Sequence, residues 1–234
     1  MSQKTFRLKE FALAKPKVFF ALALSMLGIA IFFGIGYLLF NAPSVGNTEH
    51  AIWTFDRTLM LKQLDIRTQS LNAMMIDVTA LGSQFTLYYF SIFAVFLLCS
   101  IRDFKSAIQF AIAAYGSNML QSGIKNYFQR PRPSEIEKLV DIGSFSFPSG
   151  HACASAAIYL TMALVASHYL PRKAQRTLLF ISALLLVFLI SYSRIYLGVH
   201  YPSDVIAGGA LGLTWALLVM SVRESFFPHK MSKV

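Results

Sequence analysis

Residues 18–40 read VFFALALSMLGIAIFFGIGYLLF, a stretch of 23 residues without an Asp, Glu, Lys or Arg. As a helix rising about 1.5 Å per residue, it is long enough to cross the roughly 30 Å hydrocarbon core of a bilayer. Basic residues precede it, as they precede a secretory signal peptide, but the apolar core of a signal peptide is usually only about 7 to 15 residues long. The stretch therefore predicts a retained transmembrane helix.

Five further uncharged runs of similar length follow, at residues 78–101, 106–124, 152–170, 177–193 and 205–222. Backbone in lipid must satisfy its own hydrogen bonds, and runs this long and uniformly apolar do so as helices rather than as barrel strands. The whole chain is 56% apolar and only 14% charged, which excludes a soluble domain and a disordered chain. We predict an all-α polytopic protein with six transmembrane helices in a single membrane domain, residues 1–234.

The basic residues are unevenly distributed over the loops that six crossings create. If the chain starts inside, 13 of the 21 basic residues and 3 of the 11 acidic ones lie on the inner side. The inner side then carries a charge of +10 and the outer side none, which follows the positive-inside rule and predicts that both termini are cytoplasmic. Insertion topology and anionic lipid explain this charge better than nucleic acid, for which the sequence has no recognition motif.

Two of the runs have a distinctive composition. Polar residues interrupt the 106–124 run, which predicts a helix that faces protein or water rather than lipid. They are Gln109, Ser117, Asn118, Gln121 and Ser122. The 205–222 run contains Gly208, Gly209 and Gly212, whose small size permits close helix contact.

The connection at residues 41–77 is much longer than the others. Apolar residues recur there at roughly helical spacing among charged ones, which predicts an amphipathic helix in the outer headgroup region. The apolar positions are Ile52, Phe55, Leu59 and Ile66, and the charged ones are Asp56, Arg57, Lys62, Asp65 and Arg67. The segment is either an interfacial linker or a wall of a lateral opening for a lipid substrate.

A first polar segment, KNYFQRPRP, begins at Lys125 and contains Arg130 and Arg132. The number of predicted membrane crossings that precede this segment places it on the outer side, and the same count places two further polar segments there. Arginine presents a planar fork of donors to phosphate oxygens, whereas lysine presents a compact charge. The cluster is either an anion-binding seat or a set of interfacial anchors.

The second polar segment is FPSGH, which leads directly into the 152–170 run. Ser149 is a favourable helix N-cap, and Gly150 lets a ligand approach the backbone. The unpaired N–H groups of a helix start attract anions, and His151 would lie in the first turn beside them. The segment predicts either an anion site or an ordinary turn with a cap.

The third polar segment, SRIYLGVHYPSD, ends at Asp204 and also contains Arg194. Asp204 follows His200 by four residues, so its carboxylate can reach an imidazole N–H, fix the tautomer and stabilise the imidazolium. This segment alone could be a structural ion pair. Three such segments at one membrane depth are costly unless they serve a function, and together they indicate phosphoryl transfer through a covalent histidine intermediate.

At these residues the sequence resembles the type 2 phosphatidic acid phosphatase superfamily, which also contains vanadium haloperoxidases and glucose-6-phosphatase. The family's Lys-x6-Arg-Pro motif matches residues 125–133, with Arg130 an additional arginine out of register. Its Pro-Ser-Gly-His motif matches residues 148–151, and its Ser-Arg-x5-His-x3-Asp motif matches residues 193–204. The three motifs occur in order, and the six predicted helices agree with the membrane branch of the family.

The resemblance implies a role for each matching residue. His200 would be the nucleophile, Asp204 would orient it, and His151 would act as general acid and then as base. The equatorial phosphate oxygens would be held by Lys125, Arg132, Arg194, Ser149 and Gly150. Arg130 is expected only at the rim, and no carboxylate cluster suggests a metal site or another cofactor.

The sequence therefore predicts a metal-independent lipid phosphatase in a bacterial cytoplasmic (inner) membrane, with its site facing the periplasm or the cell exterior. Candidate substrates are undecaprenyl diphosphate, phosphatidylglycerophosphate, phosphatidic acid and lipid A phosphate. The expected partners are this phosphorylated lipid and the surrounding membrane lipids, with no nucleic acid and no obligatory protein partner. A lipid phosphotransferase with the same site stays open as an alternative, and an anion transporter or a haloperoxidase is less well supported.

Overall fold

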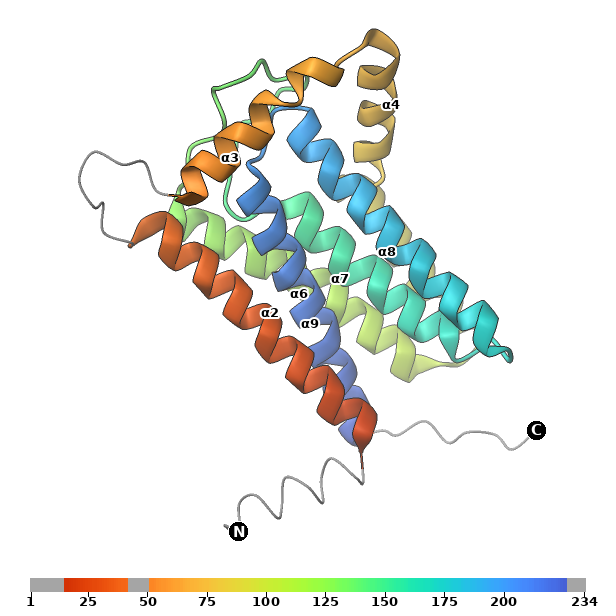
Figure 1. Ribbon diagram of the computed structural model, residues 1–234. Helices are drawn as coiled ribbons and strands as arrows, with labels where there is room; N and C mark the ends of the chain where they lie inside the picture. Colours follow the sequence, from red (N-terminus) through yellow and green to blue (C-terminus); the bar gives the residue numbers. More distant parts are fainter. Residues whose placement is uncertain (1–14, 42–50, 227–234) are drawn as a thin grey trace, which may run out of the picture.

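A computed structural model describes residues 15–41 and 51–226, which form a bundle of helices without strands (Figure 1). The helices are α2 (Pro16–Phe40), α3 (Ala51–Leu61), η1 (Leu64–Ile66), α4 (Gln69–Ala80), α5 (Gln84–Ser100), α6 (Phe104–Phe128), α7 (Gly150–Ser167), α8 (Lys173–Tyr196) and α9 (Pro202–Phe226). Four of them, α2, α7, α8 and α9, are long and apolar enough to cross a bilayer, and α4 with α5 can count as a fifth span. The all-helical membrane class is confirmed for the described residues.

The expectation of one continuous helix over residues 78–101 is wrong. The chain breaks at Leu81–Ser83, and the axes of α4 and α5 differ by 42°. Ser83 caps the new helix by accepting a hydrogen bond from the Thr86 N–H at 3.1 Å. Gly82 fits the break closely, because a Cβ at this position would lie 2.4 Å from Ile190 Cγ2. Uniform hydropathy conceals such a break, because the capping serine is itself uncharged.

Helix α7 forms the centre of the bundle, where it packs against α6, α8 and α9 (Figure 1). Its contact with α9 is close because α9 presents glycine there. A Cβ on Gly208 would lie 2.5 Å from the Ser149 carbonyl oxygen, and one on Gly212 would lie 2.1 Å from that of Cys153. The prediction that small residues permit close packing is confirmed for these two glycines, whereas nothing lies within 4 Å of a Cβ on Gly209.

Helix α6 contains the polar 106–124 run, and its composition does not by itself qualify it as a span. Gln109, Ser117 and Gln121 are buried in the protein, as expected for a helix whose polar face avoids lipid. Asn118 is exposed, so the expectation does not hold for every polar residue of the run.

The segment that follows α2 is helical, but its buried face differs from the predicted one. Residues 42–50 of the predicted 41–77 segment lie outside the described residues. In α3 the buried positions include Asp56 and Met60, whereas the apolar Phe55 is 44% exposed. Asp56 was expected on the polar face, yet it is fully buried because it pairs with a buried arginine.

The bundle has two distinct ends. At one end, Lys15 Nζ donates a hydrogen bond to the Ser225 carbonyl oxygen at 3.1 Å, so the start of α2 lies beside the end of α9. At the other end, α3, η1 and α4 lie over the loop that joins α6 to α7 and the turn that joins α8 to α9 (Figure 1). Several of the basic residues assigned to the inner side, among them Lys4 and Lys230, lie outside the described residues.

Candidate active site

The three polar segments meet at the end of the bundle that α3 and α4 cover. Their junction encloses a cavity of about 570 Å³. All but two of the predicted site residues line it, namely Lys125, Arg132, Gly150, His151, Arg194 and His200. The cavity wall is completed by residues from the start of α5 and the polar face of α6, including Gly82, Gln84, Phe85, Gln121 and Ser122.

The two predicted site residues that do not line the cavity, Ser149 and Asp204, lie directly behind it. Ser149 is the N-cap of α7, where its side chain accepts a hydrogen bond from the Ala152 N–H, and its own N–H donates to the Asp204 carbonyl oxygen at 2.9 Å. This bond ties the start of α7 to the start of α9. Gly150 begins α7, and a Cβ there would lie 2.7 Å from Gln121 Oε1, so a larger residue would displace the Gln121 side chain from the cavity wall.

His200 is 2% exposed, and its neighbours determine which ring nitrogen carries the proton. Arg132 Nη1 lies 3.2 Å from His200 Nε2, and a guanidinium can only donate, so Nε2 must be the acceptor. The proton is therefore on Nδ1, which faces Asp204 Oδ2 at 3.5 Å and Ser146 Oγ at 3.4 Å. In this tautomer the lone pair of Nε2 accepts the Arg132 N–H, and both side chains line the cavity, so Nε2 can act as a nucleophile when Arg132 turns to a bound phosphate.

The electrostatic surroundings of His200 keep it neutral. Burial is the largest influence, followed by the positive charges of Arg132, Lys125 and Arg194, and together they lower the pKa of His200 well below its ordinary value of 6.5. A backbone contact with Ser146 opposes this shift. A neutral imidazole at neutral pH has the electron pair that attack on phosphorus needs.

The Asp204 carboxylate is fully buried, and its two oxygens have different partners. Oδ2 accepts a short hydrogen bond from Ser146 Oγ and one from the Tyr201 N–H at 3.0 Å, beside the His200 ring. Oδ1 pairs with Arg130 Nη1 at 2.6 Å. Ser146 was not predicted from the sequence, because it lies outside the motifs and no spacing relates it to position 204.

Arg132 and Lys125 both bind the backbone of the loop that closes the cavity. Arg132 donates to the carbonyl oxygens of Ser144 at 2.6 Å, Phe145 at 3.3 Å and Val199 at 2.5 Å, and to Ser144 Oγ at 3.1 Å. With the contact to His200, these bonds use all five N–H groups of the guanidinium. Lys125 Nζ donates to the Phe145 carbonyl oxygen at 2.7 Å. A bound phosphate would therefore have to replace some of these backbone partners.

Arg194 differs from the other two cations because part of its guanidinium is unpaired. Nη1 donates to Thr79 Oγ1 at 2.7 Å, while Nε and Nη2 are buried without a hydrogen-bond partner among the described residues. A buried guanidinium with unsatisfied donors is costly unless an anion completes it. This side chain is ready to bind an oxyanion in the cavity.

Comparison with known proteins agrees with this arrangement. The family sequence model of the PAP2 superfamily matches residues 106–227, just over half of the 234 residues. The matched range contains all the residues that line the cavity except Gly82, Gln84 and Phe85, at the start of α5 and just before it. The chain belongs to the PAP2 superfamily. The resemblance predicted from the three motifs is thereby confirmed.

Relatives from this superfamily match different shares of the chain. Phosphatidylglycerophosphatase B from Bacillus subtilis is 29% identical over 80% of this chain and 93% of its own length. An undecaprenyl-diphosphatase from Sulfolobus acidocaldarius is 33% identical over 44% of this chain and 41% of its own. The crystal structure of a transmembrane PAP2 type phosphatidylglycerolphosphate phosphatase from Bacillus subtilis superposes with a TM-score of 0.76 at 26% identity, over 90% of this chain and 98% of that chain.

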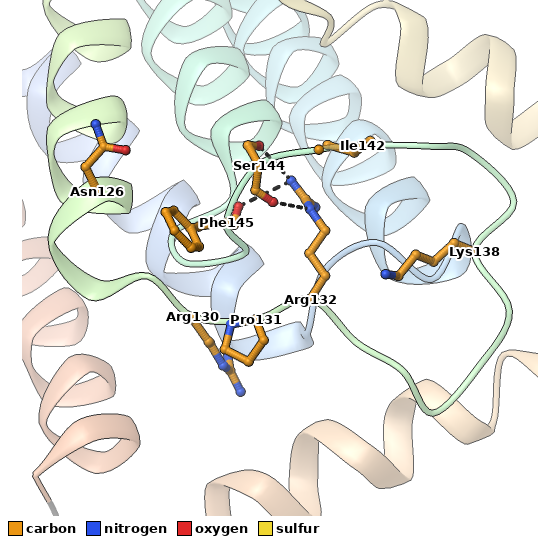
Figure 2. Close-up of a pocket in the computed structure, with 9 residues that line it drawn as sticks. Asn126, Arg130, Pro131, Arg132, Lys138, Ile142, Ser144 and Phe145 are labelled. Atoms are coloured by element: carbon orange, nitrogen blue, oxygen red, sulfur yellow. Dashed lines mark hydrogen bonds between the residues drawn. The ribbon is translucent and has the colours of Figure 1, made fainter.

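One arginine beside the PAP2 motif residues lies elsewhere than predicted. Arg130 was expected at the rim of the site, but it is 1% exposed and pairs with two buried carboxylates, Asp56 and Asp204. Figure 2 shows its side chain directed away from Ser144, whereas that of Arg132 is directed toward it. No pattern in the sequence could have joined Arg130 to Asp56, because 74 residues separate them and the intervening chain makes several turns.

A second cavity, of about 490 Å³, adjoins the PAP2 site and is shown in Figure 2. Five residues line both cavities, namely Asn126, Arg132, Ile142, Ser144 and Phe145, but neither histidine lines the second one. The hydrogen bonds of Arg132 to Ser144 and Phe145 therefore hold a wall that both cavities share.

Proposed function

We propose that this PAP2 protein is an integral membrane phosphatase that hydrolyses a phosphate monoester or diphosphate of a lipid through a phosphohistidine. The observation that carries the proposal is the cavity in which His200, His151 and Arg194 converge. The unpaired donors of Arg194 supply a seat for a phosphoryl group, and the neutral His200 supplies a nucleophile. Membership of a superfamily with lipid phosphatase relatives supports the same class of reaction.

In the first step, the lone pair of His200 Nε2 forms a bond to phosphorus while the bond from phosphorus to the leaving oxygen breaks. His151, which has to bind a proton once the anionic substrate offsets the cations around it, gives that proton to the leaving oxygen, and Asp204 stabilises the positive charge that develops on the His200 ring. Lys125, Arg132 and Arg194, with Ser149 and the Gly150 amide, bind the three equatorial oxygens. The product is a phosphohistidine and a released lipid alcohol or lipid phosphate.

In the second step, water replaces the leaving group on the opposite side of the phosphoryl group from His200. His151, now neutral, takes a proton from the water as its oxygen bonds to phosphorus, and the bond between phosphorus and Nε2 breaks. Inorganic phosphate leaves, His200 is again neutral, and His151 again carries the proton it needs for the next cycle.

We assign the substrate to phosphorylated lipids that reach the site from the bilayer. The cavity wall formed by Gln84, Phe85 and Ser122 lies between α5 and α6, and Phe85 is 79% exposed on the surface that would face lipid. Gln84 Nε2 donates to Asn118 Oδ1 at 3.1 Å across the same two helices. Undecaprenyl diphosphate, phosphatidylglycerophosphate, phosphatidic acid and lipid A phosphate are the candidates.

We further propose six crossings, with α6 as the span that composition alone does not reveal. Gln109, Ser117 and Gln121 are buried in the protein and Ser122 lines the cavity, which removes most of the cost of placing polar residues of this helix at membrane depth. The charge asymmetry then puts both termini in the cytoplasm and the site at the periplasmic face of a bacterial inner membrane. Labelling of single cysteines at Lys173 and Lys138 with a membrane-impermeant reagent in intact cells tests this: only position 138 should react.

We propose turnover without a metal ion, with the guanidinium and ammonium groups as the source of positive charge. Activity of the purified protein should therefore be the same with and without EDTA. A loss that added Mg²⁺ restores would contradict this part of the proposal.

The proposal is tested by free phosphate released from each candidate lipid by purified wild type and by His200→Ala. Wild type should hydrolyse at least one lipid, and His200→Ala should release none, because it lacks the nucleophile. Wild type should also give an acid-labile phosphoenzyme in a rapid quench. Hydrolysis by His200→Ala at the wild-type rate would refute the assigned nucleophile, and phosphate release only when a second lipid is present would identify a phosphotransferase.

A further inference from the structure

Arg130 is the centre of a buried charge cluster, of which the steps above use only Asp204. Its Nη1 pairs with Asp204 Oδ1 at 2.6 Å and donates to Ser203 Oγ at 2.9 Å, while its Nη2 pairs with Asp56 Oδ2 at 2.8 Å. The guanidinium carbon also lies 4.5 Å from the ring centre of Trp53 and 4.1 Å from that of Tyr201. Side chains of the two helices α3 and α9 and two aromatic faces therefore fix this one side chain.

From this geometry we infer that Arg130 and Asp56 are positioning residues, which fix the Asp204 carboxylate and preserve its negative charge for His200. The inference rests on the proposed function, because it assigns a role to residues that act on His200 only through Asp204. Helix α3 belongs to the segment predicted as an interfacial linker or as a wall of a lateral opening. In this inference, α3 instead helps to position the catalytic residues.

The positioning follows from how the two oxygens of Asp204 are shared. With Oδ1 bonded to Arg130, the carboxylate cannot rotate without breaking a buried ion pair. Oδ2 is thereby kept beside His200 Nδ1, where Ser146 and the Tyr201 N–H also donate to it. A carboxylate free to rotate would hold the imidazole ring less well.

The charge balance explains why a second carboxylate is needed. Arg130 alone would neutralise Asp204 and weaken its attraction for a positive imidazole ring. Asp56 offsets the charge of Arg130, so that the group of three retains one net negative charge next to His200. Asp56 is itself held by the Ser203 N–H at 2.8 Å and by Ser203 Oγ at 2.5 Å, which ties it to the first turn of α9.

The other ionisable groups near His200 come from four further elements. They are Lys125 on α6, Arg132 in the following loop, His151 on α7 and Arg194 on α8. Substitutions at positions 56 and 130 leave all of these in place, so a change in the pH profile reports the charge cluster itself.

The test compares Arg130→Gln and Asp56→Asn with Asp65→Asn, a control that makes the same chemical change on the exposed 3-10 helix that follows α3. We expect kcat to fall about 10²-fold in Arg130→Gln and less in Asp56→Asn, with KM nearly unchanged, because the phosphate ligands stay in place. Asp65→Asn should behave as wild type.

The pH profile separates positioning from a general loss of structure. Removing the positive charge of Arg130 should move the acidic limb of kcat/KM to higher pH, because the imidazolium of His200 becomes easier to form. Removing the negative charge of Asp56 should move the limb to lower pH. Shifts of both variants in the same direction would overturn the inference, since damage to the fold has no reason to follow the sign of the charge.

A double-variant comparison checks that Arg130 acts through Asp204. In an Asp204→Asn background, Arg130→Gln should cause little further loss, because the carboxylate that it orients is already gone. If Arg130→Gln lowers activity by the same factor with and without Asp204→Asn, the inference is refuted. If Arg130→Gln does not elute as a single species in detergent, the nearly isosteric Asp56→Asn is tested in its place. The pH profile and the comparison in the Asp204→Asn background then decide the inference. Inactive wild type would instead refute the proposed function.

Discussion

The contact between α7 and α9 and the polar end of the same two helices are built on different principles. Within the contact, Gly208 and Gly212 let the backbones approach, and no charge is needed. At the polar end, the helices are joined by the bond from the Ser149 N–H to the Asp204 carbonyl oxygen and by charged side chains from distant segments. The first region should be sensitive to side-chain volume, and the second to charge and donor geometry.

The largest effect is expected at the polar end, for Arg194→Ala. The variant loses the donors that have no partner in the protein, so kcat/KM should fall roughly 10²- to 10³-fold. Its thermal stability in detergent should hardly change, because only the bond to Thr79 is lost. The exposed Arg172→Ala at the other end of the bundle is the control. A large drop in melting temperature would make Arg194 a structural residue and weaken the contrast.

An intermediate effect is expected in the helix contact, for Gly212→Val. The new Cβ would lie 2.1 Å from the Cys153 carbonyl oxygen, so α7 and α9 must separate, at a cost of about 1 to 3 kcal/mol in unfolding free energy. Thermal unfolding in detergent measures this. Gly209→Val is the matched control, because nothing lies within 4 Å of its Cβ. Equal melting temperatures for the two variants would show that close packing is not what joins these helices.

The smallest effect is expected in the pH dependence of kcat/KM. Because the pKa of His200 is lowered, the acidic limb of the wild-type kcat/KM should lie below pH 6.5. Lys125→Met removes one of the positive charges responsible, so the pKa of His200 should rise and the limb should move to higher pH. The exposed Lys173→Met should leave it in place. A limb unmoved by Lys125→Met would mean that the charge of Lys125 does not contribute to the lowered pKa of His200.

The sequence predicted the helices well wherever a single helix could be recognised from its own composition. Runs such as 18–40 and 205–222 lie within α2 and α9, because lipid requires a long uncharged helix whatever its neighbours are. The prediction failed at residues 81–83, where the break depends on how Gly82 packs against α8. The 106–124 run lies within α6, as predicted, although the polar residues of that helix keep its composition alone from marking it as a span.

The candidate site was predictable only in part, for a related reason. Motif spacing predicted that His200 lies near Asp204, and the structure places their side chains 3.5 Å apart, with His200 in the turn just before α9 and Asp204 in its first turn. Arg130, Asp56 and Ser146 could not be assigned in this way, because their contacts span 54 to 74 residues of chain. Nor could the sequence reveal that the donors of Arg132 are occupied by loop carbonyl groups.

The break between α4 and α5 bears on how the enzyme would meet its substrate. Gly82, Gln84 and Phe85 place it in the cavity wall, so a lipid entering between α5 and α6 could keep its acyl or isoprenoid tails in the bilayer while only the headgroup moves. Catalysis would then follow surface dilution kinetics: the rate should depend on the mole fraction of substrate in each micelle or vesicle, and adding inert detergent at constant total substrate should slow it.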